Sequence, residues 1–277
     1  MAELFEYSTS SWAGWFLVFT RISGAMMVLP IFSSRTIPAR IKAAIAALIA
    51  LCVAPLAIAD PSGTGTRQMG ELMATPLAGA VSICGELALG WVLGATAAVL
   101  MWGAHLGGQL IGQDSGLAFG QVVDPTTGQA TAPTANLMMI FAGLAFLALE
   151  GHRLVILALC GSFDAVPPGS IGNILIHGVP LTTAAQITSE LGSQTWMLGL
   201  QIAFPASIAL LVTTVGLGLM ARMIPEMNVF AVGFAVRTGV GMLALFMTLP
   251  FIADLFGAVV TTGLQGSQMI LSGLGGN

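Results

Sequence analysis

The residues that could perform catalysis are few, and their spacing completes no catalytic motif. Asp114, Ser115 and Gly116, with His105 nearby, suggest a serine nucleophile and its base. However, Gln113 stands where the GxSxG motif requires glycine, and no strand-turn-helix pattern precedes the serine. The nucleophile hypothesis therefore fails at this position.

Metal and nucleotide motifs are missing as well. The histidines lie far apart without an HExxH motif, which argues against a metalloprotease. The single lysine, Lys42, is outside any GxxxxGK[ST] motif, so the chain has no P-loop. Each cysteine stands alone in an apolar run, which is typical of a buried small hydrophobic residue. These histidines and cysteines are His105, His152, His177, Cys52, Cys84 and Cys160. We expect no enzyme activity, no metal and no other cofactor.

Five ionisable residues in apolar surroundings are candidate buried charges. Arg21 and Glu86 could pair between the first and third apolar runs, because an unpaired charge at that depth is costly. Equally, each could meet a partner chain. Glu150, His152 and Arg153 could relay protons, but we favour a helix turn that local hydrogen bonds hold together.

The amino-acid composition indicates the kind of protein in which these residues lie. Hydrophobic residues make up 56% of the chain and charged residues only 7%, and the mean hydropathy is +0.93. A typical soluble domain has about 25% charged residues, so this is the composition of an integral membrane protein. The net charge is −4 with eight basic residues, too few and too scattered for nucleic-acid binding.

The apolar runs recur along the whole chain, at residues 12–32, 43–59, 72–112, 135–163, 196–221 and 227–260. The third is about twice the ~20 residues of a membrane span, and EGHR at 150–153 breaks the fourth. Pro205 and Pro250 interrupt the last two. Prolines and charges at such depth need surrounding protein. We predict an all-α fold of irregular helical hairpins, with about six apolar segments, some of them broken, buried against partner helices.

No polar stretch is long enough to fold separately, so residues 1–277 are expected to form a single unit. SSRTIPARIK, residues 33–42, holds three of the eight basic residues and no acid. The positive-inside bias predicts that this loop faces the cytoplasm and that the N-terminus lies outside. No basic residue precedes Arg21, so the first apolar segment is expected to be kept rather than cleaved as a signal peptide.

Residues 108–129 are polar and almost uncharged, and they carry a glycine at every fourth position from 108 to 120. Such spacing is typical of a helix face on which another backbone lies close, and this interpretation suits Gly108 and Gly112. Beyond Gly112 the composition changes, and Pro125 disfavours a helical conformation at Asp124. We predict a helix to about residue 112 and a glycine-rich loop after it.

Four stretches, in their order along the chain, resemble one known family. They are RISGAMMVLPIFSSRTIPARIK (21–42), GQLIGQDSGLAFGQVVDP (108–125), LALEGHRLVILALCGSFDAVPPG (147–169) and GLGLMARMIPEMNVFAVGFAVRTGVGM (216–242). Together they resemble the flagellar biosynthetic protein FliR family, whose injectisome counterpart is SctT, over almost the whole chain. The most specific parts are residues 222–230, similar to R-x-x-P-Q-x-N-x-F, and Gly151-His152 followed by Ser162 and Pro168-Gly169.

The resemblance implies a subunit of the type III protein export gate, in which one FliR-like chain joins several FliP and FliQ chains in a closed helical assembly. Residues 1–190 would be the FliP-like part and residues 191–277 the FliQ-like part. The implied location is the bacterial inner membrane, within a flagellar or type III secretion basal body. Glu226 and Asp114 depart from the family, which usually has glutamine at both positions.

Two sets of residues receive roles from the resemblance. The first is a loop that plugs the pore at rest: Gly112, Gly116, Leu117, Phe119, Gly120, Val122, Val123 and Asp124. The second is a helical hairpin tip that faces the cytoplasm near an FlhB-like subunit: Arg222, Pro225, Glu226, Asn228 and Phe230. From the residues alone, Pro225 ends a helix and Asn228 can cap the next one.

Two other classes of function stay open. A secondary transporter would show related halves and polar groups converging near the midplane of broken helices. The similarity between VLPIF at 28–32 and TLPFI at 248–252 is too slight to indicate such halves. A passive membrane scaffold would need no loop in a pore.

Overall fold

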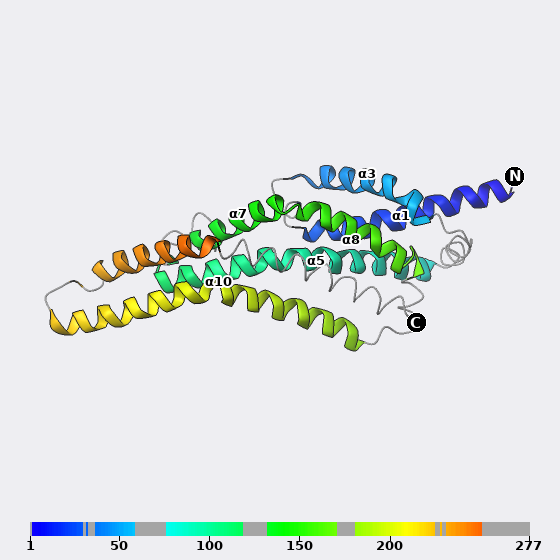
Figure 1. Cartoon of the computed structure of the whole chain (residues 1–277). Helices are drawn as coiled ribbons and strands as arrows, with labels where there is room; N and C mark the ends of the chain where they lie inside the picture. The colour runs from blue at the N-terminus through cyan, green and yellow to red at the C-terminus, as the bar shows by residue number, and fades with distance from the viewer. Residues whose placement is uncertain are drawn as a thin grey trace. The chain divides into compact units, whose positions relative to one another are not determined.

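Helices form all the regular structure in the described part of the chain. The computed structural model describes residues 2–29, 32, 37–58, 76–118, 132–170, 181–224, 228 and 231–250, without the side chains of 2–11, 58 and 181–185. The helices are α1 (Ala2–Val28), α3 (Ala39–Ile58), α5 (Pro76–Ser115), α7 (Pro133–Ala148), α8 (Gly151–Ala165), α10 (Leu181–Met223) and a further helix at Ala231–Pro250 (Figure 1). The all-α prediction is confirmed.

Four of these helices are long and apolar enough to cross a membrane, by length and composition: Ala39–Ala57, Pro76–Ser115, Gln186–Met223 and Ala231–Pro250. The pair α7 and α8 would make a fifth span if both halves belong to one. The apolar part of α1, Trp12–Val28, is shorter. The protein is therefore a membrane protein whose apolar helices differ widely in length, as the uneven runs in the sequence predict.

The break in the run 135–163 lies at Glu150. α7 ends at Ala148, and Glu150 has a positive φ of 54°, a conformation that costs a non-glycine residue about 1–2 kcal/mol. α8 then begins at Gly151. The polar EGHR sequence therefore separates two helices.

The described residues group into two compact units: those within 1–98 and 150–189 form unit 1, and those within 99–149 and 190–259 form unit 2. The long helices α5 and α10 each contribute one part to each unit. The predicted division of the chain near residue 190 into FliP-like and FliQ-like parts stays a prediction.

Unit 1 is built around the contact between α1 and α3 (Figure 1). Its core combines side chains from α1, α3 and α8: Val18, Ile22, Met26, Ala46, Ala50, Ala54 and Phe163. On another side of α1, the backbone of Arg21 and Ala25 lies against Gly90 and Gly94 of α5, so closely that a Cβ atom at either glycine would collide with it. Glycine lets two helix backbones approach in this way.

In unit 2, α5 packs against α10 and α7 through further glycines. Gly103 and Gly107 lie against Leu198 and Ile202 of α10. Gly108 faces Ala135 of α7. The predicted glycine face of this helix is therefore a packing surface for two neighbouring helices.

Candidate functional site

A buried ion pair joins α1 to α5 inside unit 1. Arg21 Nε donates to Glu86 Oε2 at 2.6 Å, and both side chains are 0% exposed. Removing two charges from water costs several kcal/mol per ion, so such a pair persists only where further hydrogen bonds satisfy both groups. The surroundings of these two residues supply those bonds.

The rest of the Arg21 guanidinium binds the C-terminal end of α8. Nη1 donates to the carbonyl and hydroxyl oxygens of Ser162, each at 3.1 Å, and Nη2 donates to the Val166 carbonyl at 2.9 Å. The Phe163 ring lies below the guanidinium, 4.3 Å from Cζ to the ring centre. α8 has no basic residue in its last turn. Arg21 therefore supplies from α1 the cation that a helix C-terminus favours.

The second oxygen of Glu86 binds the turn that follows α8. Val166 is extended, at φ −133° and ψ 92°, as the proline that follows it requires. Gly169 has a φ of 86°, which is accessible to glycine, and its N–H donates to Glu86 Oε1 at 2.9 Å. Both oxygens of the carboxylate therefore have partners, and the ion pair fixes the end of α8 and its turn.

The sequence singled out Arg21 and Glu86 but did not connect them to their other partners. Ser162 and Gly169 attracted attention only through the family resemblance, and Val166 not at all. All three of these partners contribute backbone atoms, and residue type does not reveal where a backbone carbonyl or N–H points. Of the two alternatives that the sequence left open for these residues, the structure has the pair within the chain.

The other three candidate buried charges do not form a buried cluster in this chain. Glu150, His152 and Arg153 are all exposed. Arg153 Nη1 donates to Glu150 Oε2 at 3.0 Å, with side chains 70% and 62% exposed. A pair this exposed contributes about 0–1 kcal/mol to stability. If these residues are buried at all, another chain must cover them.

The end of α5 leads into the predicted plug segment. The helix continues to Ser115, three residues beyond the expected end, and Gly112 is packed against its neighbours. Gly116 follows with a φ of 81°, and the Ala118 N–H donates to the Gly112 carbonyl at 3.1 Å. Leu117 is half-buried. The other predicted plug residues lie outside the described residues: Phe119, Gly120, Val122, Val123 and Asp124.

Contacts from α7 and from the helix at 231–250 hold this end of α5 within unit 2. A Cβ atom at Gly112 would collide with Thr134 Oγ1 of α7, which donates to the Gly108 carbonyl at 2.7 Å. Gly241 lies against the Cβ of the buried Ser115. The end of α5 is therefore fixed by α7 and by the helix at 231–250.

Asp114 provides a third connection, to α10. Its Oδ2 atom accepts a hydrogen bond of 2.6 Å from Ser207 Oγ. A carboxylate in the last turn of a helix is unfavourable because of the helix dipole, and this hydrogen bond offsets part of that cost. The sequence noted Asp114 as a departure from the family but did not indicate Ser207.

Two residues of the predicted hairpin tip are described, one in the last turn of α10 and one before the helix at 231–250. Arg222 is exposed in the last turn of α10, where a cation is favoured. Asn228 Oδ1 accepts a hydrogen bond of 3.3 Å from the Ala231 N–H, which caps the helix at 231–250. Pro225, Glu226 and Phe230 lie outside the described residues.

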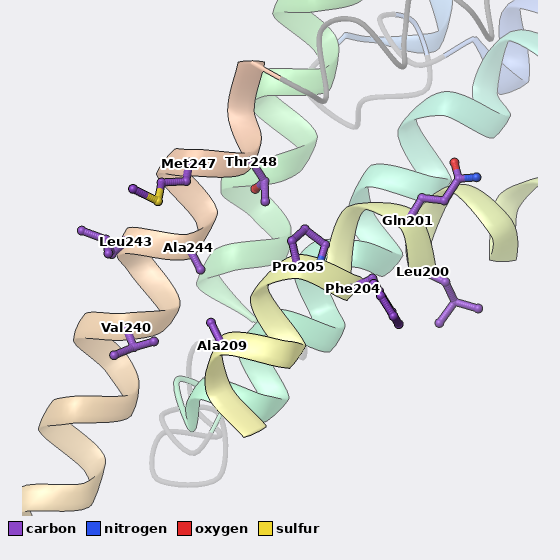
Figure 2. Close-up of a pocket in the computed structure, with 10 residues that line it drawn as sticks. All are labelled: Leu200, Gln201, Phe204, Pro205, Ala209, Val240, Leu243, Ala244, Met247 and Thr248. Atoms are coloured by element: carbon purple, nitrogen blue, oxygen red, sulfur yellow. The ribbon is translucent and has the colours of Figure 1, made fainter. Parts of the chain in front are cut away.

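An apolar groove of about 800 Å³ lies in unit 2 between α10 and the helix at 231–250 (Figure 2). Gln201 and Thr248 are its polar members. The remaining lining residues are Leu200, Phe204, Pro205, Ala209, Val240, Leu243, Ala244 and Met247. In the described residues, no group of three or more histidines, cysteines or acids could hold a metal ion.

These features define a helical membrane protein with a buried charge network and close glycine-mediated packing. Residues 12–263 match the family described as "Bacterial export proteins, family 1", and the chain belongs to this family. The resemblance to FliR noted in the sequence is confirmed. The chain is accordingly a membrane-embedded component of a bacterial export apparatus.

Named relatives include flagellar and secretion proteins. The chain is 30% identical to the flagellar biosynthetic protein FliR of Pectobacterium carotovorum, over 86% of this chain and 84% of that protein. It is 28% identical to FliR of Escherichia coli K12, over 90% and 91%. It is also 27% identical to the surface presentation of antigens protein SpaR of Salmonella typhimurium, over 83% and 81%.

Proposed function

We propose that this chain is a structural subunit of the type III protein export gate in the bacterial inner membrane. It assembles with FliP-like and FliQ-like chains into the channel that unfolded substrates cross, and the segment Gly112–Asp124 closes the pore at rest. The observation that carries the plug assignment is the end of α5. α5 ends at Ser115, where neighbouring helices hold it in place. Gly116 follows with a positive φ of 81°, at which the chain leaves the helix.

A plug needs a rigid base and a segment that can change conformation. Thr134, Ser207 and Gly241 contact the end of α5 and fix that base. The residues after it are rich in glycine and include Phe119, the only aromatic residue of residues 112–124. A dewetted apolar constriction blocks ions whereas a polar wall does not, so Phe119 is the residue best suited to seal the pore.

Exposed apolar surface supports the proposed assembly with partner chains. Many large hydrophobic side chains of α10 and of the helix at 231–250 are exposed in this chain, among them Leu211, Val215, Phe234 and Phe246. The groove between these two helices adds a concave apolar surface. Partner helices or lipid must cover such a surface, because contiguous exposed apolar patches are rare on stable monomers.

The hairpin between α10 and the helix at 231–250 is proposed to face the cytoplasm, near an FlhB-like subunit. Asn228 caps the helix at 231–250 through its hydrogen bond with the Ala231 N–H, which supports a hairpin at this point. The basic loop at residues 33–42 is placed on the same side by the positive-inside bias.

The deciding experiment combines co-purification with conductance. The wild-type chain should co-purify with FliP-like and FliQ-like chains. Deletion of residues 116–122, or the substitution Phe119→Ala, should leave this complex intact and raise the ion permeability of cells that carry it.

The alternative functions give different results in the same system. Unchanged conductance and export after the deletion would support a passive scaffold. Uptake of small solutes by the isolated chain in liposomes would support a secondary transporter.

A further inference from the structure

Two neighbouring polar side chains in the helix at 231–250 have buried atoms without a hydrogen-bond partner. The atoms are Arg237 Nε and Thr238 Oγ1, and neither has a partner among the described residues. Both residues are half-buried. A buried polar atom that loses water without gaining a partner is costly, and more so in a charged group. These two side chains therefore lack a binding partner that the chain in its assembly must have.

Elsewhere the chain satisfies comparable groups. The hydroxyls of Thr213, Thr214 and Thr248 each donate to a backbone carbonyl of the preceding turn. Arg21 binds a carboxylate and three further oxygen atoms. By contrast, Arg237 forms no ion pair with any acid of the described residues. The Arg237–Thr238 pair is thus an exception within this chain.

Arg237 lies on the face of its helix that packs against other helices of unit 2. Gly233, four residues before it, lies against Leu217 of α10. Gly241, four residues after it, lies against Ser115 at the end of α5. Residues four positions apart share a helix face, so Arg237 lies between these two contacts and on the same side as both.

α5 ends before it reaches the level of Arg237. The contacts between α5 and α10 advance along both helices together, from Gly103 with Leu198 to Gly107 with Ile202. These two helices are therefore parallel. The helix at 231–250 runs in the opposite direction to α10 (Figure 2), and hence also to α5. Because Arg237 comes one turn before the contact with the last residue of α5, it lies beyond the end of that helix.

Beyond the end of α5, residues 210–223 and 231–240 form a two-helix surface that we call the distal hairpin. Its exposed large hydrophobic side chains include Leu211, Val212, Val215, Leu219, Met220, Phe234 and Val236. On α10 they extend over roughly four helical turns. An exposed apolar surface of this kind marks a site of association. Lipid acyl chains carry no hydrogen-bond acceptor, so they would leave the Arg237–Thr238 pair unsatisfied.

The element that covers the distal hairpin must bring an acceptor to this pair. A helix is suited to apolar surroundings, because its backbone N–H and C=O groups bond to one another. The acceptor must then be a side chain. An ionised carboxylate has two acceptor oxygens and also compensates the charge of a guanidinium group. Glu86 does the same for Arg21 in unit 1.

We propose that the distal hairpin docks an apolar helix of a partner chain, and that an aspartate or glutamate of this helix binds Arg237 and Thr238. Arg237 Nε donates to one carboxylate oxygen, and Thr238 Oγ1 donates to the other. This inference rests on the proposed gate function for the identity of the partner chains, and it adds the contact by which one of them is recognised. Only a helix with its acid at the level of Arg237 satisfies both groups, so the contact also fixes the register of the partner helix.

The test uses the chain co-expressed with its FliP-like and FliQ-like partners, and native electrophoresis after affinity purification measures the amount of intact complex. Arg237→Met removes the charge and leaves the carboxylate of the partner buried and unpaired, so we expect at least about tenfold less complex. Arg237→Lys keeps the charge and should lose less. Arg40→Met is the matched control and should leave the amount unchanged, because Arg40 is exposed in the first turn of α3.

A charge exchange then identifies the partner residue. Arg237→Glu should abolish the complex, because it places two carboxylates together. This variant is combined, one at a time, with lysine in place of each aspartate and glutamate in the apolar helices of the partner chains. We expect one of these substitutions to restore the complex. Restoration by Asp114→Lys, Asp124→Lys or Glu226→Lys instead would place the carboxylate within this chain and overturn the proposal.

Two further results would count against this contact. A wild-type amount of complex with Arg237→Met would mean that Arg237 meets no buried carboxylate. Failure of every charge exchange would mean that the acceptor is not a carboxylate. Both results are distinct from a failure of the gate function itself, in which the wild-type chain would form no complex with FliP-like and FliQ-like chains at all.

Discussion

Arg21 of α1 and Glu86 of α5 form an ion pair in which every guanidinium nitrogen and both carboxylate oxygens have a hydrogen-bond partner. The partners beyond the pair are backbone and hydroxyl groups of Ser162, Val166 and Gly169. Because every polar atom of the pair is hydrogen-bonded, the two charged side chains can remain at 0% exposure in an apolar chain. It also makes the end of α8 dependent on both residues.

Removing either partner of this pair should destabilise the protein strongly. Arg21→Ala and Glu86→Gln each leave a buried group without its counter-charge, which typically costs about 3–5 kcal/mol. The expected result is a much lower level of the chain in membranes and a lower unfolding temperature of the purified complex. Arg21→Lys should have an intermediate effect, because it keeps the charge and loses the planar fork.

The double substitution Arg21→Glu with Glu86→Arg tests the role at the end of α8. It restores opposite charges but directs a carboxylate at the carbonyls of Ser162 and Val166, so it should not recover stability. Recovery to the wild-type level would mean that the pair alone matters. Arg153→Ala removes the exposed pair with Glu150 and is the control, with an expected loss below about 1 kcal/mol.

Gly112 should not tolerate a methyl group. In Gly112→Ala the new Cβ would collide with Thr134 and Ala132, and overpacking typically costs about 1–3 kcal/mol. The unfolding temperature of the complex measures the loss. Gly192→Ala on α10 is the matched control, because nothing lies within 4 Å of a Cβ there and alanine favours the helix by about 1 kcal/mol. Equal losses in both variants would contradict close packing at Gly112.

Replacement of Gly116 should impair opening rather than closure. A residue such as valine is disfavoured at a φ of 81°, so Gly116→Val restricts the conformations of the segment that follows. We expect less exported substrate in the medium and wild-type ion conductance. This phenotype is opposite in sign to the leak expected for Phe119→Ala, so a general folding defect cannot produce both. A leak in Gly116→Val would count against the plug.

The chain by itself should be degraded or should aggregate. Buried charge is not the reason, because Arg21 and Glu86 satisfy each other within the chain. The reason that stands is the exposed apolar surface of α10 and the helix at 231–250. Pulse-chase labelling with and without partner chains measures the lifetime, and a monodisperse, long-lived monomer in detergent would refute the prediction.

The hairpin tip should be accessible from the cytoplasm. In the sequence, Met227→Cys lies between Arg222, in the last turn of α10, and Asn228, which caps the next helix. A membrane-impermeant maleimide should label it in inverted vesicles and not in intact spheroplasts. Labelling restricted to spheroplasts would place the tip on the periplasmic side.

Composition and periodicity were sufficient for the class of protein and for several local features. The helical fold, the break at Glu150 and the glycine face at Gly108 and Gly112 follow from apolar runs, a polar interruption and the four-residue glycine spacing. These signals are local, because helix formation and close backbone approach depend on residues within one or two turns. The helix end was placed three residues early, since the contacts of Ser115 and Asp114 that extend it come from distant parts of the chain.

The sequence by itself determined an all-α membrane protein of the FliR family and singled out Arg21 and Glu86. Only the tertiary structure decided what those charges do. Their remaining partners lie in Ser162, Val166 and Gly169, far away in the chain, and mainly use backbone atoms that every residue type carries. Residue spacing reports which side chains share a helix face. The cost of burying a charge, by contrast, depends on all the groups around it, and only the fold brings those together.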